Sequence, residues 1–286
     1  MAEAKPQVWL VTGASRGLGL NIARAALKVG HKVIACYRNR SKNPSTFTEV
    51  EALGGVWLQL DVVGENVESQ VQSVIAQYGQ IDVLVNNAGY PILGSIEHTS
   101  VDLIDGIFKT NFVGTIRTIQ AALPSMRSRR SGTIVNIGSA TAINPTPGLG
   151  LYSATKSAVE GVTEALQAEV ASFNIRVLVV HPGMMATDIL DPQGTGIQLP
   201  LDDAYKGTPV ELTYSGLFNT KYLSMAADPA NVAQRIVELV DNTGIMAGRA
   251  LGPRVYLGRE AGAYVEERAA QYAGLVKDMK DVWESV

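Results

Sequence analysis

Short runs of β-branched and aliphatic residues alternate with helix-periodic stripes over the first 183 residues, and this alternation constrains the fold more than any other feature. The runs are expected to be strands at Val8–Thr12, Lys32–Cys36, Val56–Leu60, Ile81–Asn86, Thr133–Ile137 and Ile175–Val180. They are continuously apolar, which is typical of strands buried on both faces of a parallel sheet. Between them, stripes such as Val67, Val71 and Val74 have helical spacing. The pattern predicts an α/β fold: one doubly wound parallel sheet with helices on both faces.

The alternation of strand and helix patterns stops after Gly183 and resumes near Pro229. Residues 184–227 form a long irregular insert, which in a compact domain is usually functional, and we expect a lid over the substrate. A helix at Pro229–Val240 and a strand at Arg254–Leu257 bring the expected sheet to about seven strands. An amphipathic C-terminal helix at 259–284 is expected to pack on this domain or on a partner subunit. Residues 1–286 are therefore interpreted as a single domain.

Composition excludes several classes of protein. Lys plus Arg number 24 against 27 Asp plus Glu, and the net charge of −3 argues against nucleic-acid binding. The lone Cys36 excludes an internal disulfide framework and fits a reducing compartment. With three histidines and no metal-ligand spacing, we expect no metal site. Without a signal segment or an apolar run of about 18 residues, the sequence predicts a cytoplasmic protein with no membrane span.

A glycine-rich turn follows the first expected strand and opens the first helix: Thr12-Gly13-Ala14-Ser15-Arg16-Gly17-Leu18-Gly19. Gly13 permits a tight turn, and Gly17 and Gly19 lack the Cβ atoms that would keep the backbone away from a pyrophosphate. The helix N-terminus then presents free N–H groups to that anion. Glycines at turns are more often structural, but at the first strand-to-helix turn of a parallel sheet they favour dinucleotide binding.

The same stretch matches G-x-S-x-G, the nucleophile elbow of serine hydrolases, with Ser15 as the nucleophile. Only twelve residues precede Gly13, which is too few for the upstream strand and loop that supply an oxyanion hole. That interpretation also leaves Gly19 unexplained. The hydrolase is therefore the weaker alternative.

Tyr152 and Lys156 lie four residues apart near the start of a helix, so their side chains share one helical face. A phenol has a pKa near 10, and a nearby ammonium group lowers it toward neutral pH, where it serves as a general acid or base. Ser139 follows the expected strand 133–137, at the edge of the sheet where active-site side chains gather. The alternatives are a surface contact for the pair and a turn cap for Ser139. His181 is interpreted as a packed or hydrogen-bonded residue and not as a base.

Together these motifs resemble the short-chain dehydrogenase/reductase family, and the resemblance is closest over residues 7 to 190. Within the family, the sequence is most similar to the branch that contains hydroxysteroid dehydrogenase-like reductases and fungal ketoreductases. The matching segments are TGASRGLG, Asn86-Asn87-Ala88-Gly89, Ser139, Tyr152 with Lys156, and Pro182-Gly183 followed by Thr187. The resemblance implies a Rossmann-type fold and hydride transfer between the nicotinamide C4 of NADP(H) and the carbonyl or secondary alcohol of an apolar, medium-sized substrate.

The resemblance also implies a role for each catalytic residue. Tyr152 would exchange a proton with the substrate oxygen, which Ser139 would hold and polarise. Lys156 would lower the tyrosine pKa and bind the nicotinamide ribose. Asn111 would hold a water that links Lys156 to solvent, its alternative being a buried amide bonded to helix backbone.

The loop after the second expected strand bears on the choice between NAD and NADP. It carries no acidic residue for a ribose 2′-hydroxyl, whereas Arg38 and Arg16 are suited to a 2′-phosphate. Asp61 matches a family contact to the adenine, and Asn87 one near the adenosine ribose. The other positions that the resemblance assigns to the cofactor are Ser15, Leu18, Val62, Ala88, Gly89, Tyr152, Lys156, Pro182, Gly183 and Thr187.

Two further expectations concern assembly and the competing class of function. The family implies a homodimer or homotetramer formed through long helices near 101–127 and 152–173, the second of which carries small residues. The competing class is a regulator that binds NADP on the same fold without turnover. The complete set of Ser139, Tyr152 and Lys156 argues against it.

Overall fold

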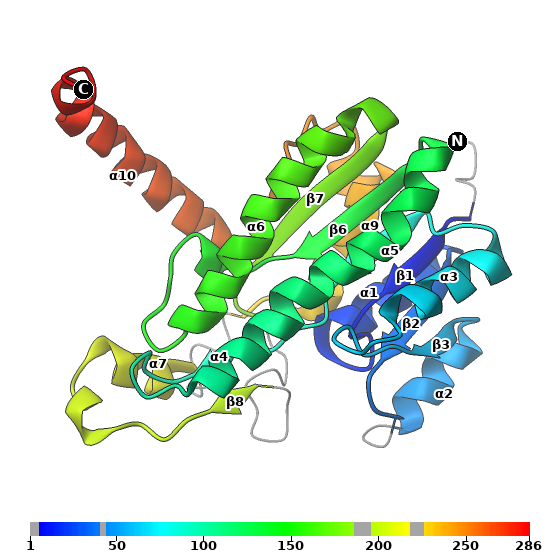
Figure 1. Ribbon diagram of the computed structural model, residues 1–286, viewed down its shortest axis with the longest axis horizontal. Coiled ribbons are helices and arrows are strands. Elements are labelled where there is room, and N and C mark those ends of the chain that lie inside the picture. The colour runs from blue at the N-terminus through cyan, green and yellow to red at the C-terminus, as the bar shows by residue number, and fades with distance from the viewer. Residues whose placement is uncertain (1–5, 41–43, 186–195, 218–225) are drawn as a thin grey trace.

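The computed structural model describes residues 6–40, 44–185, 196–217 and 226–286. Its centre is a seven-stranded sheet of order β3-β2-β1-β4-β6-β7-β9 in which all neighbouring strands are parallel (Figure 1). The strands are β1 (Val8–Val11), β2 (Lys32–Tyr37), β3 (Val56–Gln59), β4 (Val83–Asn86), β6 (Gly132–Ile137), β7 (Ile175–Pro182) and β9 (Arg254–Leu257). The predicted doubly wound parallel sheet is confirmed.

Helices cover both faces of this sheet (Figure 1). The helices of the described residues are α1 (Gly17–Lys28), α2 (Pro44–Ala52), α3 (Val67–Tyr78), α4 (Val101–Phe108), α5 (Gly114–Arg129), α6 (Gly150–Val170), α7 (Pro209–Leu217), α9 (Pro229–Asp241) and α10 (Arg259–Trp283). Trp9 and Val11 of β1 pack in one core with α1 and α9. Val8 and Leu10 pack in a second core with α3, α5 and α6. Because successive residues of β1 enter opposite cores, the strand is apolar throughout.

The strand order reverses beside β1, where β2 and β4 are its two neighbours. Chain segments leaving the carboxyl ends of β1 and β4 diverge at this point, and open α/β sheets bind ligands in the crevice it creates. The glycine-rich turn follows β1 and the Asn87-Ala88-Gly89 segment follows β4. The fold therefore brings both motifs to the same edge of the sheet.

Part of the insert 184–227 has regular structure that the sequence did not indicate. A two-residue strand β8 (Ile197–Gln198) pairs in parallel with β5 (Ile92–Leu93), and α7 follows. Tyr214 ties these parts together, because its hydroxyl donates to the carbonyl oxygens of Leu93 (3.1 Å) and Leu199 (3.0 Å). Residues 186–195 and 218–225 lie outside the described ranges, and so does Thr187.

Two sequence signals explain why α9 begins where it does. The Asp228 carboxylate accepts the N–H of Ala230 at 2.8 Å, and Pro229 occupies the first helical position, where its missing N–H costs nothing.

The helical path from α4 to α5 is continuous and includes a π-helical segment, Lys109–Val113. Short 3₁₀ turns occur at 140–142, 171–173, 203–205 and 244–246.

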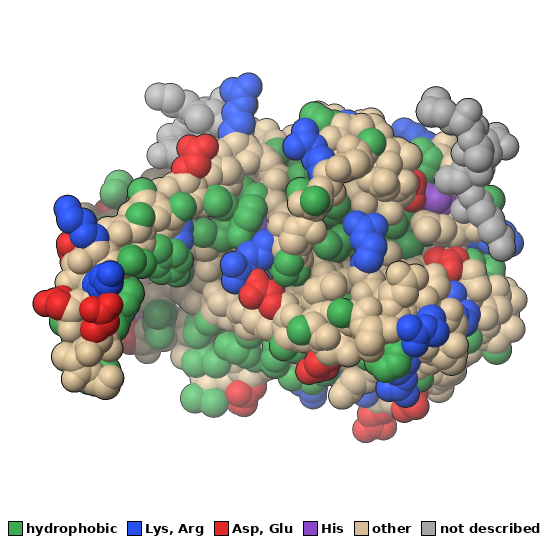
Figure 2. All heavy atoms as spheres, turned by 90° about the horizontal axis from the view of Figure 1, so that it is seen from above, with side chains coloured by type: hydrophobic (Ala, Val, Ile, Leu, Met, Phe, Trp, Pro, Cys, Tyr) green, Lys and Arg blue, Asp and Glu red, His purple; other side chains and the backbone are tan. Residues whose placement is uncertain are grey.

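Helix α10 leaves the body of the molecule (Figure 1). Ala261 is fully buried, and Arg268 donates to the carbonyl oxygen of Ile143, so the first turns are anchored. All residues from 271 to 286 are exposed, and several are apolar (Figure 2). No helix within the described ranges combines the length and apolar character needed to cross a membrane.

Candidate active site

The Thr12 hydroxyl joins the glycine-rich turn to the segment after β4. It accepts the backbone N–H groups of Asn87 (2.9 Å) and Ala88 (3.0 Å) and donates to the carbonyl of Val85 (3.3 Å). The Asn87 side-chain amide in turn donates to the carbonyls of Thr12 (3.0 Å) and Gly13 (3.1 Å). Thr12 is 1% exposed, so this hydroxyl is a buried centre of the site that the sequence motif did not reveal.

Two glycines of the turn are required by this close approach. Gly13 has φ +64°, and an added Cβ would lie 2.9 Å from the Cα of Ala88. At Gly19 an added Cβ would lie 2.3 Å from the Asn87 amide nitrogen. The missing Cβ of Gly19 therefore makes room for Asn87, and Gly19 does not border the cavity described below, which differs from the expectation that it faces a pyrophosphate. Gly17, with φ +54°, does border that cavity.

A single cavity of about 700 Å³ runs along the carboxyl edge of the sheet. Of the residues predicted from the sequence, Gly13, Ser15, Arg16, Gly17, Leu18, Arg38, Asp61, Val62, Asn87, Ala88, Gly89, Ser139, Tyr152, Lys156, Pro182 and Gly183 line it. Arg38 follows β2 directly, and Asn39, Phe47 and Leu60 border the same end of the cavity. The structure thus brings almost all of the predicted site together.

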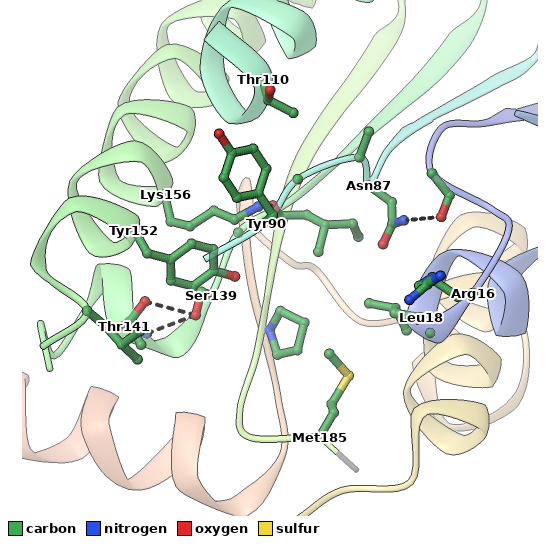
Figure 3. Close-up of a pocket in the computed structure, with 18 of the residues that line it drawn as sticks. Arg16, Leu18, Asn87, Tyr90, Thr110, Ser139, Thr141, Tyr152, Lys156 and Met185 are labelled. Atoms are coloured by element: carbon green, nitrogen blue, oxygen red, sulfur yellow. Dashed lines mark hydrogen bonds between the residues drawn. The ribbon is translucent and has the colours of Figure 1, made fainter. Parts of the chain in front are cut away.

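At the other end of the cavity lie Ser139, Tyr152 and Lys156 (Figure 3). Ser139 caps the 3₁₀ turn after β6: its Oγ accepts the Thr141 N–H at 3.2 Å and contacts the Thr141 hydroxyl at 3.0 Å. The Ser139 side chain lies beside the Tyr152 hydroxyl, close enough to lower the pKa of Tyr152. The Lys156 ammonium donates to the Ile137 carbonyl at 2.7 Å and lies 5.6 Å from the centroid of the Tyr152 ring.

Burial controls the ionisation of this pair. It raises the pKa of Tyr152 to about 12, partly offset by the Ser139 side chain, and it lowers the pKa of Lys156 to about 8. For Tyr152 this is the reverse of the sequence-based expectation, which had the ammonium lowering the phenol pKa. The reason is that the ammonium bonds to a carbonyl while the phenol loses its hydration. Tyr152 therefore carries its proton at neutral pH.

Asn111 lies in the π-helical segment and does not border the cavity. Its side-chain oxygen accepts the Tyr90 N–H (3.0 Å), and its amide nitrogen donates to the Tyr90 carbonyl (2.9 Å) and the Thr155 hydroxyl (3.1 Å). An added Cβ at Gly89 would lie 2.9 Å from the Asn111 side-chain oxygen. These bonds match the second of the two sequence-based interpretations, a buried amide that is hydrogen-bonded to backbone, here the backbone of Tyr90.

Sequence reasoning missed several residues that border the catalytic end of the cavity, namely Tyr90, Thr141, Glu260 and Tyr264. The Glu260 carboxylate accepts the Met184 N–H (2.6 Å) and the Tyr264 hydroxyl (3.0 Å), which ties the start of α10 to the segment after β7. The sequence signal for Thr141 was its position two residues after Ser139. No comparable signal pointed to Glu260, because its contacts span 76 residues of sequence.

The hydrolase alternative needs a histidine beside Ser15. The three histidines instead contact other side chains or backbone: His31 pairs with Asp241, His98 with Ser95, and His181 with Ser139. Ser15 is a member of the glycine-rich turn that borders the cavity. Among the residues that the structure describes, no cluster of three or more His, Cys, Asp or Glu side chains is suited to a metal ion.

A parallel doubly wound sheet with a glycine-rich turn at its switch point and a Ser-Tyr-Lys set beside it defines a nicotinamide-dependent oxidoreductase site. The family model described as short chain dehydrogenase matches residues 7–197, and the chain belongs to this family. Families of this kind use NAD or NADP, and the backbone of Gly13, Gly17 and Ala88 borders the cavity where such a cofactor would lie.

Curated relatives and solved structures agree with this assignment. The chain is 44% identical over 204 residues to oxidoreductase claN of Passalora fulva, covering 71% of this chain and 92% of the relative. It is 33% identical over 254 residues to human retinol dehydrogenase 8 (84% and 79% covered). It is 39% identical over 189 residues to 3-ketodihydrosphingosine reductase of Bacteroides thetaiotaomicron (65% and 67% covered). A crystal structure of a short-chain dehydrogenase from Streptomyces avermitilis superposes with a TM-score of 0.85 at 31% identity, over 99% of both chains.

Proposed function

We propose that this oxidoreductase uses NADPH to reduce the carbonyl group of an apolar, medium-sized compound, with Tyr152 as the proton donor. The observation that carries the proposal is the grouping of Ser139, Tyr152 and Lys156 at one end of a cavity whose other end is the glycine-rich turn. The cofactor, when bound, supplies a hydride from C4 of its nicotinamide. All other steps belong to the side chains of this chain.

In this mechanism Ser139 orients the substrate carbonyl. A hydroxyl has one donor and two acceptor sites, and the Thr141 N–H and hydroxyl both approach Ser139 Oγ. The Ser139 proton is then directed to an oxygen in front of it. Tyr152, protonated because burial raises its pKa to about 12, donates to the developing alkoxide. The Lys156 ammonium stabilises the negative charge that Tyr152 acquires.

The preference for NADPH rests on Arg16 of the glycine-rich turn and Arg38 after β2, which both border the cavity. A guanidinium binds a phosphate through charge-assisted, bidentate hydrogen bonds worth about 1.5–3 kcal/mol. Replacement Arg38→Asp is therefore expected to raise the KM for NADPH by roughly 10- to 100-fold and to leave the KM for NADH nearly unchanged. Equal use of both cofactors by the wild type contradicts the preference.

The substrate end of the cavity supports an apolar ligand. It is bordered by Leu149, Met184, Met185, Leu212, Thr213 and Tyr264. Among the described residues that border this end, the one acidic group is Glu260, which already accepts two hydrogen bonds. Leu212 and Thr213 come from α7, in keeping with a lid role for the insert 184–227. The names of two relatives specify apolar compounds, retinol and 3-ketodihydrosphingosine.

The decisive experiment is a panel of steroid-like, polyketide-like and aryl ketones, with NADPH oxidation followed by absorbance. We expect turnover by the wild type and a loss of at least 100-fold in kcat for Tyr152→Phe with an unchanged Kd for NADPH. Turnover that survives in Tyr152→Phe contradicts the assigned acid. NADPH binding without turnover of any ketone supports the competing regulator.

A homodimer or homotetramer is proposed through α5 and α6. Small residues of α6 face outward, and Ala154, Gly161, Ala165 and Ala168 are exposed. An added Cβ at Gly161 would meet nothing within 4 Å in the single chain. The variant Gly161→Trp is therefore expected to fold but to elute as a monomer, whereas an unchanged elution volume contradicts this interface.

The cytoplasmic location expected from the lone Cys36 stays a prediction.

A further inference from the structure

His181 lies fully buried near the end of β7 and contacts the backbone of Ser139. Its Nδ1 is 3.3 Å from the Ser139 nitrogen and 2.9 Å from the Ser139 carbonyl oxygen. Strand β6 ends at Ile137, and the last ladder-like bond on this side runs from the Gly138 N–H to the Val180 carbonyl at 2.7 Å. The imidazole therefore anchors the Ser139 backbone just beyond the last hydrogen bond between β6 and β7.

The imidazole ring is itself held in place from several sides. Gly138 packs against it so closely that an added Cβ would lie 2.6 Å from Nδ1. Tyr256, the partner of His181 in the register of β7 and β9, stacks on the ring with centroids 5.3 Å apart and planes at 19°. On the side of α6, the Glu160 Oε2 lies 3.3 Å from Nε2, a contact without hydrogen-bond geometry, so the packing of Gly138 and Tyr256 is what fixes the ring.

Burial, with a smaller contribution from nearby charges, leaves the ring neutral at pH 7. Burial lowers the pKa of His181 to about 4; Lys156 and Arg254 add to this shift, while the bond to Ser139 and Glu164 oppose it. Arg254 in turn pairs with Glu160 at 2.8 Å and with Glu164. A neutral imidazole bonds Ser139 in either tautomer: Nδ1–H donates to the carbonyl, and bare Nδ1 accepts the N–H. The ring is thus suited to hold the serine backbone and not to transfer a proton.

Helix α6 connects this contact to the general acid. Tyr152, Lys156, Glu160 and Glu164 follow one another at four-residue intervals and so share one face of the helix. The first two face the cavity, and the last two form the ion pairs around Arg254 beside the His181 ring. One helix face therefore carries the Tyr152 hydroxyl and also borders the His181 ring.

We propose that His181 is a positioning residue that fixes the backbone of Ser139 and so holds the Ser139 hydroxyl beside the Tyr152 hydroxyl. This inference rests on the proposed function, because the alignment of the two hydroxyls matters for proton delivery to a substrate oxygen. His181 itself does not border the cavity. Its loss should accordingly lower kcat and leave cofactor binding intact.

The test compares His181→Leu with His181→Asn, two side chains of nearly equal shape. The Asn side chain places a polar atom near the position of Nδ1 and can donate to, or accept from, Ser139, whereas Leu can do neither. We expect a kcat at least 10-fold lower for His181→Leu, a kcat within about threefold of wild type for His181→Asn, and an NADPH Kd within twofold for both. A third variant, His181→Gln, places its amide at the position of Nε2, and we expect the kcat loss of His181→Leu with a folded protein.

Three results would overturn the proposal: full activity of folded His181→Leu, equal loss in His181→Asn and His181→Gln, or a loss that appears only in the KM for NADPH. A crystal structure of His181→Gln supplies a readout that needs no substrate. We expect Ser139 Oγ to move away from the Tyr152 hydroxyl, and an unmoved Oγ contradicts the inference. If the wild type reduces no ketone while Oγ moves in the variant, the proposed function fails and the positioning role stands.

Discussion

Replacing Thr12 with Val is expected to weaken the junction between the glycine-rich turn and the segment after β4. Valine has nearly the same shape as threonine, so the packing of this buried position is retained. What disappears is an oxygen that accepts the N–H groups of Asn87 at 2.9 Å and Ala88 at 3.0 Å. The Val85 carbonyl loses a weaker side-chain donor at 3.3 Å but keeps the Thr12 N–H at 3.0 Å.

The size of the effect follows from the two N–H groups left without an acceptor. Each unsatisfied buried donor costs about 1–3 kcal/mol, and both groups lie at partly buried residues, which places each near the lower end. We therefore expect Thr12→Val to lower the free energy of unfolding by about 2–3 kcal/mol. Against a typical stability of about 5–15 kcal/mol, such a loss is readily measured.

Urea denaturation of Thr12→Val and Thr12→Ser measures this loss. The Val variant should show a lower midpoint with an unchanged m-value, and Ser, which keeps the hydroxyl, should lose less than about 1 kcal/mol. The NADPH Kd of the Val variant should rise as well, because the turn is no longer held against Ala88. A Val variant as stable as wild type, or a Ser variant as unstable as Val, refutes the argument.

Four further outcomes are expected, two of them at Lys156. The folded pKa of Lys156, about 8, lies below its usual value of 10.5, so the unfolded chain binds more protons between these two values. The Lys156 contribution to the free energy of unfolding should therefore rise from pH 8 to pH 10, and denaturation of wild type against Lys156→Met should show this difference. The rate of ketone reduction should fall over the same range, with an apparent pKa near 8, because the ammonium loses its charge. Thr141→Val removes one of the two contacts to Ser139 Oγ, worth about 1 kcal/mol, and should lower kcat about fivefold, whereas Thr141→Ser should not. Glu260→Ala removes the acceptor of the Met184 N–H and the Tyr264 hydroxyl, and should raise the KM for the ketone more than the KM for NADPH in steady-state kinetics.

The fold could be predicted because its signals are local. Continuous apolar runs gave strands at positions close to those observed, and the first expected strand, Val8–Thr12, differs from β1 by one residue. The insert could not be predicted, because β8 is only two residues long and exists through its pairing with Ile92–Leu93, about a hundred positions earlier. A strand of that length has no periodicity to detect.

The site divides in the same way. Glycines, Tyr152 and Lys156 were found because the chemistry demands those residue types at fixed short spacings. The direction of the Tyr152 pKa was wrong because burial is a property of the folded chain: the spacing shows that an ammonium is near, but not that both groups are dehydrated. Gly19 was assigned to the cofactor because its steric partner, Asn87, is 68 positions away and its proximity cannot be inferred from the motif.

The protonation state of Tyr152 has a consequence for the direction of the reaction. Burial raises the pKa of Tyr152 to about 12, so the phenol is protonated at pH 7 and holds the proton that a developing alkoxide takes, whereas alcohol oxidation first requires the phenol to lose it. Reduction needs the donor, and oxidation needs the base. The proposed binding of a cofactor 2′-phosphate by Arg38 and Arg16 would favour reduction as well, because NADPH is the cofactor that cells use for reduction. An alcohol-oxidising activity at neutral pH that exceeds the reductive one would show that a bound cofactor brings the Lys156 ammonium close enough to the phenol to reverse this preference.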